Sequence, residues 1–166
     1  MAGGPGSPYN AVITGAWWML REVELSTVRA AHVEFTGCWT TSGLGVRLTL
    51  PASKNGPAAL GASRAHRCHC IGRVLVNCPA HAVVRQFFWL RHAFPARFSN
   101  GVPDLDLVLF PDLAGRVVEK AAMTATIVTV ARHLGVRDLA AGSECVSGHS
   151  LRATGAQGLA HMGLAG

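Results

Sequence analysis

The sequence predicts a single α+β domain that is mostly helical and holds a small antiparallel sheet. Three observations lead to this class. Of the 166 residues, 49% are hydrophobic and only 14% are charged, so the chain can bury a core. Apolar residues recur at spacings of three and four in several long segments, which is typical of helices. Apolar and polar residues alternate in two shorter runs, which indicates strands.

Helices are expected over residues 11–25, 81–94 and 118–134, and a further helix of small residues is expected after Gly148. Residues 1–10 are rich in glycine and proline and are expected to form a flexible arm before a domain spanning 11–166. The residues expected to face the core are Val83, Phe87, Leu90 and Phe94 in the second helix, and Met123, Ile127, Val130 and Leu134 in the third.

Two or three short strands are expected between Val33 and Lys54. Runs 31–36 and 43–50 both alternate apolar and polar residues, and the loop between them would make the pair a hairpin. The following turn, 51–57, presents Lys54. A lysine in such a turn is usually just solvated.

The most unusual passage is a cysteine- and histidine-rich stretch at about residues 64–81. Its spacing is C-x-C followed by C-x-x-H, and it supplies Cys68, Cys70, Cys78 and His81. These are the ligand types of a structural Cys3His zinc site, which leaves no open position for chemistry. The competing interpretation is a set of reduced, half-buried cysteines that flank a loop. Five cysteines, an odd number, fit thiols or metal ligands better than a disulfide framework.

The net charge of +6 makes a polyanion a plausible partner, with nucleic acid first and an anionic membrane second. No apolar run reaches the length of a membrane span. Nucleic acid is therefore preferred, and a membrane is not among the expected partners. An intracellular location is the default expectation.

Two short motifs supply candidate anion ligands. His149 and Arg152 lie three apart at the start of a predicted helix, where free backbone N–H groups also favour an anion. Arg21 and Glu24 are again three apart and share a helix face. Taken alone, the first motif is commonly no more than a helix start, and the second no more than a surface ion pair.

In order along the chain, Arg21 with Glu24, then Lys54, then His149 with Arg152 resemble the catalytic domain of phage-integrase-like tyrosine recombinases. The local sequence around these residues is similar in particular to recombinase-like open reading frames of dinoflagellate genomes. The insertion with its cysteines and histidine is similar to one that those sequences carry. The resemblance extends from about residue 11 to the end of the chain.

The resemblance implies DNA breaking and rejoining in site-specific recombination or integration. Arg21 and Arg152 would clamp the scissile phosphate, because two guanidinium groups can hold its non-bridging oxygens. His149 would donate a hydrogen bond to that phosphate or help to move a proton, and Lys54 would protonate the departing 5′ oxygen. Glu24 would hold the structure near Arg21.

That reaction needs no cofactor, so zinc would only brace the fold. The expected partners are DNA and other recombinase copies assembled on it, and the expected location is the nucleus.

The sequence departs from the family's pattern at the nucleophile. The attacking tyrosine should follow the helix that His149 and Arg152 open, yet the only tyrosine is Tyr9, and His161 comes too early for the next family position. The chain is therefore expected to be inactive alone: a fragment, a subunit that a partner complements, or a decayed relic. The alternative is a non-enzymatic, basic, zinc-braced module that binds nucleic acid through its phosphates.

Overall fold

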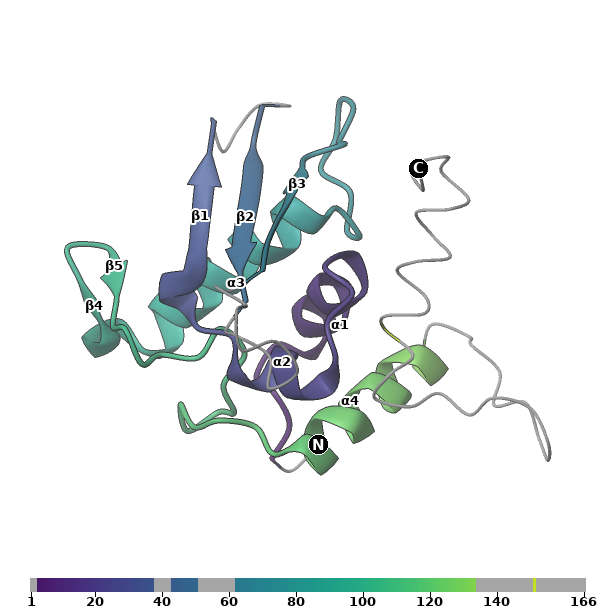
Figure 1. Ribbon diagram of the computed structural model, residues 1–166, viewed down its shortest axis with the longest axis vertical. Helices are drawn as coiled ribbons and strands as arrows, with labels where there is room; N and C mark the ends of the chain where they lie inside the picture. Colours follow the sequence, from purple (N-terminus) through teal and green to yellow (C-terminus); the bar gives the residue numbers. More distant parts are fainter. Residues whose placement is uncertain (1–2, 38–42, 51–61, 134–150, 152–166) are drawn as a thin grey trace.

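The structure, a computed structural model, describes residues 3–37, 43–50, 62–133 and 151. Within this part the chain folds as an α+β domain with four α-helices and a small three-stranded antiparallel sheet. Helix α3 crosses one face of the sheet, and α1 lies between α3 and α4 (Figure 1). The coarse fold class is as expected.

The sheet has the strand order β1-β2-β3, with β1 Val33–Thr36, β2 Gly45–Thr49 and β3 Ser63–Arg67. Phe35 pairs with Val46 across the first ladder, which confirms the predicted hairpin. The third strand lies beyond Lys54, outside the predicted interval. Its sequence, SRAHR, has no aliphatic residue larger than alanine, so hydrophobic alternation could not reveal it.

The helix predicted over residues 11–25 is in fact two helices, α1 Pro8–Trp17 and α2 Glu22–Thr27. Met19 adopts a left-handed φ of 52°, and the N–H of Leu20 bonds to the carbonyl of Gly15 at 2.8 Å. These are features of a Schellman helix stop, which usually contains glycine at the left-handed position. The prediction was wrong because methionine occupies that position here.

The start of the chain also differs from the expectation. Helix α1 begins at Pro8, and Gly4 and Pro5 are buried. The N–H of Gly6 donates to the carbonyl of Pro111 at 2.9 Å. Residues 3–10 therefore pack on the domain, whereas their composition predicted a flexible arm.

The two longer helices lie close to their predicted positions, with α3 at Pro79–Ala93 and α4 at Lys120–His133. Between them, the expected linker contains a short 3-10 helix, η2 Pro95–Arg97. It is followed by a small hairpin in which β4 Phe98–Ser99 pairs with β5 Val102–Pro103. A first 3-10 turn, η1 Ala30–His32, precedes β1. Among the residues described, no helix is long and apolar enough to cross a membrane.

The core lies where α1, α2, α3 and α4 meet the inner face of the sheet. Of the residues expected to face it, Val83, Leu90, Met123, Ile127 and Val130 are buried, Phe87 and Phe94 pack against its edge, and Leu134 lies outside the described residues. The largest fully buried side chains include Trp18, Phe110, Leu20, Leu25, Leu48 and Leu90.

Candidate metal centre and phosphate-binding residues

The four predicted metal ligands come from the end of the sheet and the start of α3. Cys68 directly follows β3, and its N–H extends the ladder by donating to the carbonyl of Leu44 at 2.7 Å. Cys78 is the N-cap of α3, and His81 lies three residues later in the same first turn. A C-x-x-H spacing at a helix start therefore directs both side chains to one side. The intervening loop returns Cys70 to the same place.

The ligand atoms of Cys68, Cys70, Cys78 and His81 all lie within 4.8 Å of one another. The Nδ1 atom of His81 is 3.5 Å from the Sγ of Cys68 and 3.4 Å from each of the other two sulfurs. In tetrahedral coordination, Zn–S bonds of about 2.3 Å and Zn–N bonds of about 2.0 Å separate nitrogen and sulfur by about 3.5 Å. The four residues therefore fit a single metal ion, as the spacing predicted.

Backbone N–H groups surround the sulfurs. The N–H of Cys70 donates to the Sγ of Cys68 at 3.3 Å, and the N–H of Leu75 donates to the Sγ of Cys70 at 3.2 Å. Burial raises the pKa of the Cys68 thiol to about 11. Burial also opposes ionisation of Cys70, but the Leu75 N–H and the neighbouring Cys68 and Cys78 thiols bring the pKa of Cys70 below its ordinary value.

A cation lies beside the cluster. Arg85, one turn of α3 beyond His81, is held by hydrogen bonds to the carbonyl of Val76 at 2.6 Å and to the Oδ1 of Asn10 at 3.3 Å. Burial lowers the pKa of Arg85, and the adjacent Cys78 and Cys70 thiols offset part of this shift. Three thiolates and a divalent ion carry a net charge of −1, which this guanidinium can offset.

Tryptophans of α1 join the cluster to the rest of the fold. The indole N–H of Trp17 donates to the carbonyl of Asn77 at 2.9 Å, and its ring lies 4.8 Å from the ring of His69. Trp18 packs edge-on against His66, with ring centroids 4.6 Å apart. Burial lowers the pKa of His66. The segment carrying the ligands is therefore fixed against α1.

Arg21 and Glu24, two residues of the predicted phosphate site, form an ion pair. The guanidinium Nη2 of Arg21 is 2.9 Å from the Oε1 of Glu24, and the Arg21 N–H donates to the Oε2 at 2.8 Å. Glu24 thereby caps the first turn of α2 and orients the Arg21 side chain in one step. About a third of that side chain, 34%, remains exposed.

The other predicted phosphate ligands, Lys54, His149 and Arg152, lie outside the described residues. Leu151, which immediately precedes Arg152, is described and is buried. A Cβ added at Gly15 of α1 would lie 2.5 Å from the Cδ1 of Leu151. Leu151 is thus packed directly on α1, the helix that precedes Arg21.

Sequence reasoning missed the groups around the cysteines, Arg85 and Trp17 among them. Their signal is weak, because an arginine in a helix and a tryptophan in an apolar run have many ordinary uses. It also missed a charge asymmetry that is plain in the sequence: no aspartate or glutamate occurs from Phe35 to Pro103, whereas this stretch holds eight lysines and arginines.

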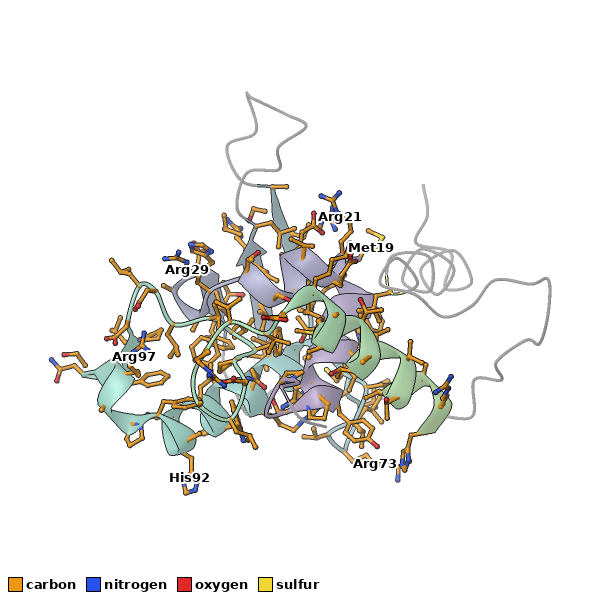
Figure 2. All side chains as sticks on the ribbon, turned by 90° about the horizontal axis from the view of Figure 1, so that it is seen from below. Met19, Arg21, Arg29, Arg73, His92 and Arg97 are labelled. Carbon is orange, nitrogen blue, oxygen red and sulfur yellow. The ribbon has the colours of Figure 1, made fainter. Side chains whose placement is uncertain are left out.

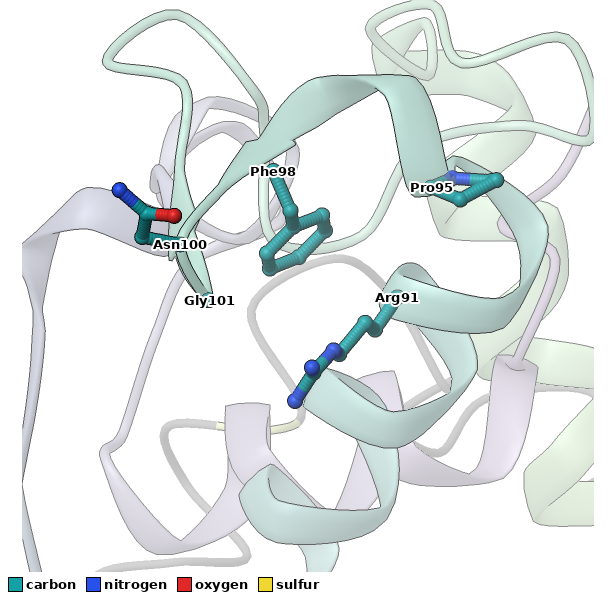
Figure 3. Close-up of a pocket in the computed structure, with 5 residues that line it drawn as sticks. All are labelled: Arg91, Pro95, Phe98, Asn100 and Gly101. Atoms are coloured by element: carbon teal, nitrogen blue, oxygen red, sulfur yellow. The ribbon is translucent and has the colours of Figure 1, made fainter.

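A shallow pocket of about 490 Å³ lies at the far end of α3 (Figure 3). Its lining consists of Arg91, Pro95, Phe98, Asn100 and Gly101. None of these residues offers a carboxylate, thiol or imidazole, so the pocket supplies no acid–base pair.

Comparison with protein-family models, with curated proteins and with solved structures finds no match.

Proposed function

We propose that this chain is a tyrosine-recombinase-like domain that is stabilised by zinc and binds the phosphate backbone of DNA. In this proposal, Arg21 and Arg152 hold one phosphate, with His149 as a hydrogen-bond donor and Lys54 as the proton donor to a leaving oxygen. The observation that carries it is the Arg21–Glu24 pair, because the resemblance implies this pairing at these two positions. The pair leaves about a third of the Arg21 side chain exposed, where a ligand can reach it.

The packing of Leu151 on Gly15 supports the same proposal. Leu151 belongs to the motif that contains His149 and Arg152, and α1 leads directly into the turn before Arg21. A buried leucine within the motif is a short tether between two segments that are far apart in sequence. The proposal requires such a tether, because the two arginines must reach the same phosphoryl oxygens.

We propose binding rather than strand cleavage for this chain alone. Tyr9 lies in the first turn of α1, and its ring contacts His133 of α4 with centroids 6.0 Å apart. The family pattern puts the nucleophile after the helix that His149 and Arg152 open, so this proposal does not assign that role to Tyr9. Cleavage would need a tyrosine from another chain or from a longer form of this one.

For the cysteine cluster we propose a structural zinc ion held by Cys68, Cys70, Cys78 and His81. All four coordination positions would be protein ligands, so the ion would supply no Lewis-acid chemistry to a substrate. Its role would be to join β3 to α3. The same geometry favours the second candidate function, a non-enzymatic zinc-braced module that contacts nucleic acid only through scattered phosphates.

DNA-binding measurements separate the two functions. With a zinc-loaded chain and duplex DNA, Arg21→Gln or Arg152→Gln should reduce affinity by at least about a hundredfold if both groups hold one phosphate, as removing half of a clamp leaves a buried anion poorly paired. In a diffuse electrostatic module, each change should only lower the salt slope by about one. Arg91→Gln, an equal loss of charge at the end of α3, is the matched control. A small, equal effect for all three variants would refute the clamp.

A further inference from the structure

The segment that carries the cysteines, residues 68–78, exposes three aliphatic side chains. We call it the cysteine loop. Ile71 is 92% exposed, Val76 77% and Val74 59%. Single exposed aliphatic residues need no explanation, but three on one short loop mark an interaction site.

Hydrogen bonds hold this loop in one shape. The N–H of Arg73 donates to the carbonyl of Ile71 at 2.9 Å, and the N–H of Cys78 donates to that of Leu75 at 3.2 Å. Gly72, between Ile71 and Arg73, has a φ of 73°, and a Cβ there would meet nothing within 4 Å. Ile71 therefore stands at the tip of a tight turn that projects into solvent, and the apolar groups are presented rather than folded inward.

The surroundings of the tip are positively charged. Arg67 and Arg73 are exposed, and neither makes an ion pair within the part of the chain that the structure describes. His69 is exposed beside them. Because residues 35–103 contain no acidic side chain, nothing in this stretch of sequence neutralises the two arginines. Such a field attracts a polyanion.

The loop lies away from the proposed phosphate clamp. Figure 2 shows Arg21 at one edge of the molecule and Arg73 at the opposite edge. The cysteine loop and Arg21 therefore cannot contact the same phosphate, and the loop requires a ligand group of its own.

We propose that the cysteine loop is a second DNA-contact element, in which Arg67 and Arg73 contact phosphates and Ile71 enters the minor groove. Aliphatic wedges flanked by basic residues insert between base steps and bend the duplex in this way. The inference rests on the proposed function only in taking DNA as the ligand, and it does not require the clamp at Arg21.

Other occupants fit the loop less well. Loops and helices that enter membranes typically present tryptophan, phenylalanine or leucine, whereas the exposed apolar residues here are all β-branched. A second copy of the chain would bring the same basic surface against itself, which is unfavourable. The combination of a narrow aliphatic tip with unpaired arginines best matches a nucleic-acid groove.

The test uses the full zinc-loaded chain and a labelled duplex of about 25 base pairs, with affinity followed by fluorescence anisotropy over a range of salt concentrations. The double variant Arg67→Gln/Arg73→Gln should lower the salt slope by about two, because two phosphate contacts are lost. Ile71→Ser should weaken binding about tenfold at every salt concentration without changing the slope, because the lost contact is apolar. Ile71→Ser should also reduce the DNA bend measured by energy transfer between the duplex ends.

Matched controls are Arg91→Gln for charge and Val102→Ser for an exposed aliphatic residue on the β4–β5 hairpin; each should change the affinity less than twofold. Far-UV circular dichroism and zinc content should be the same for every variant. The proposal is overturned if Ile71→Ser binds like the parent chain, or if the double variant keeps its slope. It is equally overturned if Ile71→Ser abolishes only self-association or vesicle binding.

The two proposals fail separately. Loss of binding in the loop variants with no effect of Arg21→Gln would refute the clamp and support the loop. The reverse pattern would support the clamp and refute the loop.

Discussion

At the scale of single residues, the pKa values of the thiols decide how readily the cysteine cluster can bind a metal ion. Cys68 has a pKa of about 11 because it is buried, whereas hydrogen bonds bring the pKa of Cys70 below its ordinary value. Metal ligation requires thiolates, so a metal ion must displace the Cys68 proton at any pH below about 11. The number of thiol protons released on binding thus sets the pH dependence of metal affinity.

We expect zinc affinity to rise with pH between about 6 and 8, by at least about tenfold per pH unit, because at least one proton leaves for each ion bound. Competition with a chelator of known pH dependence measures this. Because the pKa of Cys68 is raised, lowering the pH stabilises the protonated, metal-free form and so weakens zinc binding. Cys68→Ser should lower both the affinity and its slope with pH. An affinity independent of pH would contradict the assignment of Cys68 as a ligand.

At the scale of elements, the junction between α1 and Leu151 depends on one missing Cβ. A Cβ at Gly15 would lie 2.5 Å from the Cδ1 of Leu151, closer than carbon atoms approach, and 3.2 Å from the Cδ2 of Leu25, which is a tight contact. Alanine would gain about 1 kcal/mol of helix propensity over glycine but would force Leu151 to move, at a cost of about 1–3 kcal/mol. Glycine is therefore used here for close packing rather than for an unusual backbone angle.

This balance predicts that the effect of Gly15→Ala on the free energy of unfolding changes sign when Leu151 is shortened. Gly15→Ala should lower the free energy of unfolding by about 1 kcal/mol in the parent chain. In a Leu151→Ala background the closer steric partner is gone and only the tight contact with Leu25 remains, so the same change should raise the free energy of unfolding by up to about 1 kcal/mol. Urea unfolding of the four proteins in this double-mutant cycle measures both effects. Destabilisation of equal size in both backgrounds would show that Leu151 does not pack on Gly15.

Particular elements explain how far the sequence could predict this fold. Helices α3 and α4 and the β1–β2 hairpin were predictable because their apolar residues follow the period of each element. The break between α1 and α2 was not, because Met19 adopts a conformation that patterns assign to glycine. Strand β3 was not predicted because its inward positions hold Arg64, which exchanges hydrogen bonds with Trp18 at the end of α1, and His66, whose ring packs on Trp18.

The candidate site divides in the same way. The sequence supplied the right ligand types, and C-x-C and C-x-x-H each place two of them together. It left open a set of reduced cysteines, because the meeting of the two pairs depends on the packing of β3 beside α3. The pairing of Arg21 with Glu24 was predictable from its local spacing. The meeting of Arg21 with Lys54, His149 and Arg152 depends on long-range packing, and it stays a prediction.

At the scale of the whole molecule, the cluster joins elements that are distant in sequence. Cys68 ends the sheet, Cys78 and His81 begin α3, and Trp17 of α1 donates a hydrogen bond to the residue before Cys78. A metal ion at this point would cross-link the end of β3 to the start of α3, and the Trp17 hydrogen bond ties α1 to the same segment. Metal binding would therefore contribute to the stability of the entire domain, since the four ligands are not assembled in the unfolded chain.

Removal of zinc should consequently lower the melting temperature of the whole domain in one cooperative transition. At a free zinc concentration about 1,000 times the Kd, the ion contributes about 4 kcal/mol, which corresponds to a shift of about 8–16 °C for a domain of this size. Calorimetry with and without a chelator measures the shift. Cys78→Ser should melt at the lower temperature in both conditions, whereas Trp17→Phe should keep its zinc dependence and lose only the Asn77 hydrogen bond. Identical melting curves for the parent chain with and without chelator would exclude a structural metal at this site.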